Sequence, residues 1–132
     1  MEIKRILVID DEPDIREIAS MSLKITNRWT VLMAASGPEG IAIAATEQPD
    51  AILLDVIMPE VDGLATLKAL KANPLTQHIP VLLLTATVRV ATHQQYAALG
   101  AKAVLLKPFD PGQLGYQIAR VLSWQNEVSS HA

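Results

Sequence analysis

Four runs of consecutive apolar residues recur along the chain, and each one ends at a polar side chain. The runs cover residues 6–9, 51–54, 81–84 and 103–106, and they lead into Asp10-Asp11, Asp55, Thr85 and Lys107. Because their apolar residues do not alternate with polar ones, the runs are typical of parallel strands covered on both faces. We therefore expect acids, a hydroxyl and an ammonium group to meet at one edge of a buried sheet.

Segments of helical length and period separate these strands. A first helix begins near Pro13, and its expected apolar face consists of Ile15, Ile18, Ala19, Ser22 and Leu23. A second begins at the capping box Ser36-Gly37-Pro38-Glu39 and ends at Gln48-Pro49. Both helices would follow a strand directly and lead into the next one.

Three further helices follow in the second half of the chain. One follows Asp62-Gly63 and stops near Asn73-Pro74, and the last opens with the cap-like sequence Asp110-Pro111-Gly112-Gln113. Between them, a helix within 88–99 has mostly alanines at its apolar positions and is interrupted by polar residues. We expect this fourth helix to be the least firmly packed.

With residues 31–34 as the remaining strand, strand and helix alternate five times. Strict alternation predicts an α/β fold, with a parallel sheet, right-handed crossovers and helices on both faces. A chain of 132 residues is the size of one domain, which we place at 1–125, with a short polar tail at 126–132. The initiating Met1 and the polar end favour a complete chain.

Composition narrows the classes of function. A net charge of −3 gives no basic field for nucleic acid phosphates or a membrane surface. The absence of cysteine excludes disulfide and thiolate chemistry, and no apolar stretch approaches the ~20 residues of a membrane span. We expect a cytoplasmic protein that binds neither nucleic acid nor membrane directly.

The strand ends carry the candidate chemistry. If the first and third strands are neighbours, Asp10 or Asp11 can join Asp55 around one hard divalent cation, which we expect to be Mg²⁺ and which relieves the repulsion between the carboxylates. Asp55 could then attack phosphorus, with positive charge from Lys107 and a hydrogen bond from Thr85. The set suits phosphoryl transfer better than hydrolysis of carbon substrates.

Each of these residues also has a plainer interpretation. Asp10 and Asp11 precede Pro13 and could merely cap the first helix, and Asp55 could be an ordinary turn residue. Thr85 could simply end a strand, and Lys107 could be a solvated surface residue. Four strand ends that each carry a suitable group favour the functional interpretation. The three histidines, His78, His93 and His131, lack metal-ligand spacing and are expected at the surface.

Taken together, residues 3 to about 122 resemble the receiver domains of two-component response regulators, especially single-domain ones like the chemotaxis regulator. The motifs that carry the resemblance are Val8-Ile9-Asp10-Asp11-Glu12, Leu54-Asp55-Val56-Ile57-Met58-Pro59, Asp62-Gly63, Leu84-Thr85-Ala86 and Lys107-Pro108-Phe109. The resemblance implies a flavodoxin-like doubly wound (βα)5 fold with strand order 2-1-3-4-5, and a cis peptide bond before Pro108.

The resemblance also implies a function. Asp55 would accept phosphate from a phosphohistidine of a sensor histidine kinase or phosphotransfer protein, and Thr85 and Lys107 would contact the phosphoryl group. Mg²⁺ would be held by Asp10, Asp11, Asp55 and the backbone carbonyl of Ile57. The protein would be a phosphorylation-controlled binding module with an unknown downstream target. It would not be an enzyme, because it would catalyse only its own phosphorylation and dephosphorylation.

Signalling is where the sequence departs from the family. Val104 stands where the family usually carries a switch Tyr or Phe, so output should depend on Thr85, the loop after it and the fourth helix. On the last helix, Tyr116, Arg120 and Trp124 recur at spacings of four, which predicts an outward stripe for dimerisation or partner binding. The alternative is that Trp124 folds back onto the tail or a neighbouring helix.

Two other functions remain open. The chain could be the receiver segment of a larger hybrid kinase or transcription regulator. It could also be an aspartate-dependent phosphatase or a flavin protein on the same architecture. Against these, no strand ends in the Asp-x-Asp pair of such phosphatases, and Asp11-Glu12-Pro13 would repel phosphate where a flavin protein binds it.

Overall fold

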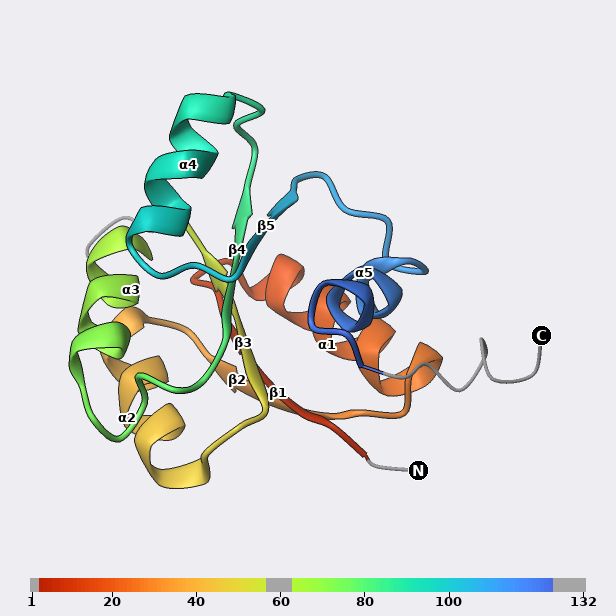
Figure 1. Ribbon diagram of the computed structural model, residues 1–132. Helices are drawn as coiled ribbons and strands as arrows, with labels where there is room; N and C mark the ends of the chain where they lie inside the picture. The colour runs from red at the N-terminus through yellow and green to blue at the C-terminus, as the bar shows by residue number, and fades with distance from the viewer. Residues whose placement is uncertain (1–2, 57–62, 125–132) are drawn as a thin grey trace.

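The computed structural model describes residues 3–56 and 63–124, in which strands and helices alternate (Figure 1). The strands are β1 (Arg5–Ile9), β2 (Thr30–Ala34), β3 (Ala51–Asp55), β4 (Val81–Thr85) and β5 (Ala103–Leu106). The helices are α1 (Pro13–Thr26), α2 (Gly37–Glu47), α3 (Gly63–Ala72), α4 (Val90–Ala98) and α5 (Leu114–Val121). All strand pairs are parallel, in the order β2-β1-β3-β4-β5. The predicted α/β fold and strand order are confirmed.

The sheet lies between two helical layers, with α2, α3 and α4 on one side and α1 and α5 on the other (Figure 1). Successive residues of a strand point to opposite faces, so each strand contributes to both cores. In β1, Leu7 and Ile9 belong to the cluster on the α2 and α3 side, whereas Ile6 and Val8 belong to the α1 and α5 side. This arrangement explains the continuous apolar runs in the sequence.

The predicted boundaries of α2 are confirmed by its caps. The Ser36 hydroxyl accepts a hydrogen bond from the backbone N–H of Glu39 at 3.3 Å, and the Glu39 carboxylate accepts one from Ala35 N–H at 2.9 Å. At the other end, Gln48 takes a left-handed conformation with φ of 50°. Local sequence therefore sets both ends of this helix.

Two predictions about other helices were wrong. Ile18, assigned to the apolar face of α1, is 44% exposed, and the buried residues are Ala19, Ser20 and Leu23. Asp110 does not cap α5, whose N-cap is Gln113. Instead its carboxylate accepts a hydrogen bond from the N–H of Gly112 at 2.9 Å, in the turn before the helix.

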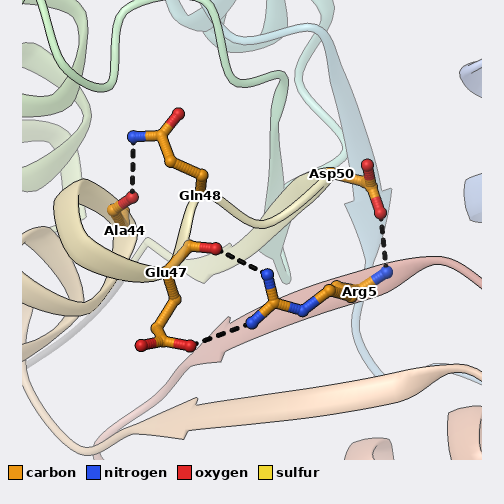
Figure 2. A network of polar contacts seen from close by, with 5 residues as sticks. All are labelled: Arg5, Ala44, Glu47, Gln48 and Asp50. Carbon is orange, nitrogen blue, oxygen red and sulfur yellow. Dashed lines mark hydrogen bonds and ion pairs between the residues drawn. The ribbon is translucent and has the colours of Figure 1, made fainter.

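Polar contacts join β1 to the end of α2 and the start of β3 (Figure 2). The Arg5 guanidinium donates to the Glu47 carbonyl at 2.6 Å and to its carboxylate at 3.0 Å. The backbone N–H of Arg5 donates to Asp50 at 2.8 Å. These contacts lie at the edge where β3 begins, opposite the edge where Asp55 ends it.

Helix α4 is sparsely anchored, as the sequence predicts. Tyr96 is its one buried residue, whereas Val90 at its start is 68% exposed. In the part of the chain that the structure describes, no helix has the length and apolar character needed to cross a membrane.

Candidate functional site

Three aspartates converge where β1 and β3 end. These strands are neighbours with Ile9 opposite Leu54, so Asp10 and Asp55 follow at adjacent positions along the sheet edge. Asp10 is 1% exposed, Asp55 is 2% exposed, and Asp11 is half-buried. Each offers a carboxylate oxygen, and these oxygens lie within 4.8 Å of one another. Such a set of hard oxygen donors fits a hard divalent cation such as Mg²⁺.

The Asp10 carboxylate is oriented by the start of α1. It accepts a hydrogen bond from the backbone N–H of Glu12 at 2.9 Å, while the N-cap Glu12 makes no side-chain cap bond. The helix-cap interpretation is therefore wrong for Asp10, because its carboxylate closes the turn before α1 and does not bond to an N–H group of the helix. The same turn holds the carboxylate beside Asp55.

Arg16 is a residue of this region that the sequence analysis did not single out. Its guanidinium donates to the backbone carbonyl of Asp10 at 2.7 Å. The start of α1 therefore holds the backbone of Asp10, just after β1, as well as the Asp10 side chain. The sequence feature that could have identified Arg16 is its position six residues after Asp10, in the first turns of the following helix.

The pKa of Asp10 is raised from 3.8 to about 6, chiefly because its carboxyl group is buried. The negative charges of Asp55 and Asp11 contribute to this rise, whereas the Glu12 N–H and the Lys107 ammonium oppose it. Bringing the three acids together therefore costs free energy that a bound cation would offset.

Lys107 reaches the acidic cluster from β5. Its ammonium group lies 2.8 Å from the Asp55 carboxylate, with which it forms both a salt bridge and a hydrogen bond. The side chain of Asp55 is 1% exposed and that of Lys107 is 22% exposed, so the pair is well shielded. The lysine backbone is fixed by its N–H bond to the Thr85 carbonyl at 2.8 Å, and the Lys107-Pro108 peptide is cis as expected.

Thr85 ends β4, the strand between Asp55 and Lys107. It is 3% exposed, and its hydroxyl accepts a hydrogen bond from the backbone N–H of Thr87 at 3.2 Å. Thr87 in turn lies 2.8 Å, through its carbonyl, from Nε2 of His93 on α4. The loop after β4 therefore connects Thr85 to the fourth helix.

His93 is a second residue that sequence reasoning missed. It is half-buried and bonded to the loop rather than simply solvated, and its ring also stacks on Tyr96 with centroids 6.4 Å apart. His78 is exposed as predicted, and His131 lies outside the described residues. An isolated histidine among alanines and glutamines gave no sequence signal for this contact.

Three of the other residues predicted for the switch and the interface lie on β5 and α5. Val104 is half-buried and packs against the core on the α2 and α3 side. Tyr116 is half-buried and Arg120 is exposed, both on α5. Ile57, whose carbonyl was expected to bind metal, and Asp62 lie outside the described residues.

The prediction that Trp124 continues the α5 stripe was wrong. The helix ends at Val121, and Ser123 has φ of 58°, which turns the chain away from the helical path. Trp124 packs edge-to-face on Trp29, with ring centroids 5.3 Å apart, and the Lys4 ammonium lies 4.9 Å from the centre of the Trp124 ring. The structure agrees better with the alternative, in which Trp124 folds back. Its partner Trp29, however, lies in the segment that follows α1 and not in a helix or the tail.

Comparison with known proteins gives one family. Residues 6–119 match the family described as the response regulator receiver domain. The chain is 39% identical over 128 residues to the DNA-binding dual master transcriptional regulator RpaA of Synechocystis, which covers 97% of this chain and 53% of RpaA. It is 42% identical over 121 residues to the response regulator PleD of Caulobacter vibrioides, covering 90% of this chain and 25% of PleD.

Solved structures give the same picture. The chemotaxis protein CheY4 of Vibrio cholerae is 32% identical and superposes with a TM-score of 0.84, covering 91% of this chain and 99% of that one. A structure described as a putative response regulator from Chloroflexus aurantiacus gives 31% identity and a TM-score of 0.82, covering 92% and 99%. The chain thus spans nearly all of these two proteins, but about half of RpaA and a quarter of PleD.

Proposed function

Because the chain belongs to the response regulator receiver family, we propose that Asp55 accepts a phosphoryl group and that phosphorylation controls binding to a protein target. Receiver domains are signalling modules that interact with histidine kinases or phosphotransfer proteins and with downstream targets. The observation that carries the proposal is the buried Asp55 carboxylate, held 2.8 Å from Lys107 beside Asp10 and Asp11.

Transfer would proceed by attack of an Asp55 carboxylate oxygen on the phosphorus of a phosphohistidine. The new oxygen–phosphorus bond forms as the phosphorus–nitrogen bond breaks, and the imidazole leaves with its electron pair. Lys107, already on the carboxylate, supplies positive charge beside the transferred group. Thr85 supplies a hydroxyl donor from the neighbouring strand.

Asp10, Asp11 and Asp55 would hold Mg²⁺, together with the carbonyl of Ile57, which lies outside the described residues. When bound, this ion supplies compensation for the negative charge of the phosphoryl oxygens. The support for it is the donor set itself, three carboxylates within reach of one centre, and the raised pKa of Asp10.

A second candidate is that this receiver controls a larger regulator. It is favoured by the relatives, of which RpaA is about twice and PleD about four times as long as the matched part. In that case the output would belong to another segment, and direct DNA contact would lie there rather than on this acidic chain. We propose a cytoplasmic location in either case. Family membership argues against the phosphatase and flavin alternatives.

Phosphorylation can be tested directly. Incubation of the protein with acetyl phosphate or phosphoramidate and Mg²⁺ should add one phosphoryl group, detected by intact mass spectrometry. Asp55→Asn should abolish the addition. Asp50→Asn is the matched control, because Asp50 lies at the opposite end of β3, where it accepts a bond from Arg5. Labelling that persists in Asp55→Asn, or is lost equally in Asp50→Asn, would refute the assignment.

A further inference from the structure

Helix α1 carries an apolar face that the domain does not cover. Ile18, Met21 and Ile25 are 44%, 58% and 71% exposed. Their spacings of three and four place them on one stripe of the helix. The stripe lies opposite Ala19 and Leu23, which are fully buried against the sheet. Scattered exposed apolar residues are ordinary on a surface, but three in register on one helix form a continuous strip.

The exposed charged residues of this helix differ in sign between its two halves. Asp14 and Glu17 are exposed in the N-terminal half and Lys24 is exposed in the last turn, whereas the half-buried Arg16 is bonded to the Asp10 carbonyl. Glu17 and Lys24 are seven residues apart, so they flank the apolar stripe on the same side. Met21 lies close to their midpoint.

This pattern is complementary to itself when the helix is reversed. If two copies of α1 pack antiparallel about a twofold axis near Met21, Ile18 of each copy lies near Ile25 of the other. Glu17 of each copy then lies across from Lys24 of the other, on both sides of the axis. We propose that the α1 face, defined as Ile18, Met21 and Ile25 with flanking Glu17 and Lys24, pairs with the α1 face of a second copy of this chain.

The size of the α1 face sets the expected strength of this dimer. A helix of 14 residues is about 21 Å long, so its face is smaller than a standard interface of ~800 Å² per partner. The edge strand β2 extends the apolar area, because Met33 is 40% exposed and pairs with Val8, whose side chain faces α1. We therefore expect a weak dimer, with a dissociation constant of about 0.1 to 1 mM.

The choice of a second copy rests on the charge pattern. Binding of an unrelated partner would require only the apolar stripe. An isologous interface must be self-complementary, and opposite charges placed symmetrically about the centre of the stripe meet that condition. This dimer forms in the unphosphorylated protein and does not require a phosphoryl group on Asp55.

Self-association can be measured by sedimentation velocity between 10 μM and 1 mM protein in low salt. Met21→Glu places two like charges at the twofold axis and should raise the dissociation constant at least tenfold. Leu75→Glu is the matched control, because Leu75 is 60% exposed in the α3–β4 loop and should not affect dimerisation. Thermal unfolding of each variant shows that it is folded. A wild type that stays monomeric to 1 mM overturns the proposal, as do equal effects of the two variants.

Charge reversal tests the antiparallel arrangement itself. Glu17→Lys and Lys24→Glu each replace two attractive pairs by two repulsive ones and should weaken dimerisation about fivefold. Mixing the two variants in equal amounts restores opposite charges at both pairs, so the mixture should associate more tightly than either variant alone. A mixture no tighter than the weaker variant would overturn the antiparallel pairing, and with it the assignment of the second copy.

Discussion

The buried acid Asp10 is the residue at which function and stability conflict. Its carboxylate is 1% exposed beside two other acids, and its pKa is raised from 3.8 to about 6. The folded state therefore binds a proton at Asp10 more tightly than the unfolded chain does. This favours folding at pH below 3.8, and the benefit is lost as pH rises through about 6.

We accordingly predict that Asp10→Asn stabilises the metal-free protein at neutral pH. The shift of about two pKa units corresponds to at most about 3 kcal/mol, and we expect a gain of about 1 to 3 kcal/mol at pH 7.5. Urea unfolding in the presence of a chelator measures it.

The pH dependence separates this effect from a packing change. The advantage of Asp10→Asn should shrink between pH 6 and pH 4, because wild-type Asp10 is then protonated. Added Mg²⁺ should shrink it at pH 7.5, since the ion stabilises the wild type. An advantage that is constant from pH 4 to 7.5 would contradict charge burial as its cause.

At the scale of elements, the start of α3 is packed directly on the end of β3. A Cβ atom added to Gly63 would collide with the Asp55 carbonyl and lie 2.6 Å from Val56 Cα. These are backbone atoms of Asp55, the proposed phosphoacceptor at the end of β3, and of the residue that follows it, so they cannot move without displacing the acceptor. The Gly63 N–H also donates to the Val56 carbonyl at 2.7 Å.

Gly63→Ala should therefore lower the free energy of unfolding by about 2 to 3 kcal/mol, as overpacking of a close contact does. Gly112→Ala is the control, because its added Cβ would meet the Asp110 carboxylate at an ordinary 3.4 Å. Urea unfolding of both variants gives the comparison. Equal stabilities of the two variants would show that the α3 start has room to move.

The contact of His93 with the loop after β4 supports helix α4. With Tyr96 as its one buried residue, α4 has few other anchors, and Val104 supplies no aromatic ring next to the site. His93→Ala removes the 2.8 Å contact with the Thr87 carbonyl, worth about 1 kcal/mol.

Amide exchange in α4 should then accelerate about fivefold, while exchange in β3 stays unchanged. Gln94→Ala, an exposed neighbour on the same helix, controls for the loss of a polar side chain. Equal exchange rates in the two variants would mean that the loop contact does not hold the helix.

These elements also show what the sequence could and could not predict. The site positions at Asp10, Asp55, Thr85 and Lys107 were accessible because each ends an apolar run, and ends of parallel strands share one edge of a sheet. The caps of α2 were accessible because they are local. In contrast, the exposure of Ile18 depends on how α1 is rotated over the sheet, which periodicity does not fix.

The predictions for Trp124 and His93 also failed because tertiary contacts decide where these side chains lie. Trp124 left the predicted stripe because Ser123 turns the chain just after α5, where Trp29 offers an aromatic partner from a distant segment. His93 is bonded to a carbonyl, and a backbone acceptor leaves no sequence signal. The interface role of Tyr116 and Arg120 stays a prediction.

At the scale of the whole molecule, the two helical layers and the sheet assemble a site that no single segment contains. Asp10 and Asp11 follow β1, Asp55 ends β3, and Lys107 follows β5. The acidic cluster exists in this form only when the strands are paired. A cation that binds the cluster should therefore bind the folded state and stabilise the entire domain.

We predict that Mg²⁺ raises the free energy of unfolding by about 1.4 kcal/mol at ten times its dissociation constant. The fluorescence of Trp29 and Trp124 can report unfolding, because this pair joins segments far apart in the chain. Asp11→Asn should lose most of the Mg²⁺ effect, since it removes one of three carboxylates. Asp14→Asn, an exposed acid in the first turn of α1, should keep it. If Asp11→Asn gains as much stability from Mg²⁺ as the wild type, Asp11 is not a ligand and the ion binds without it.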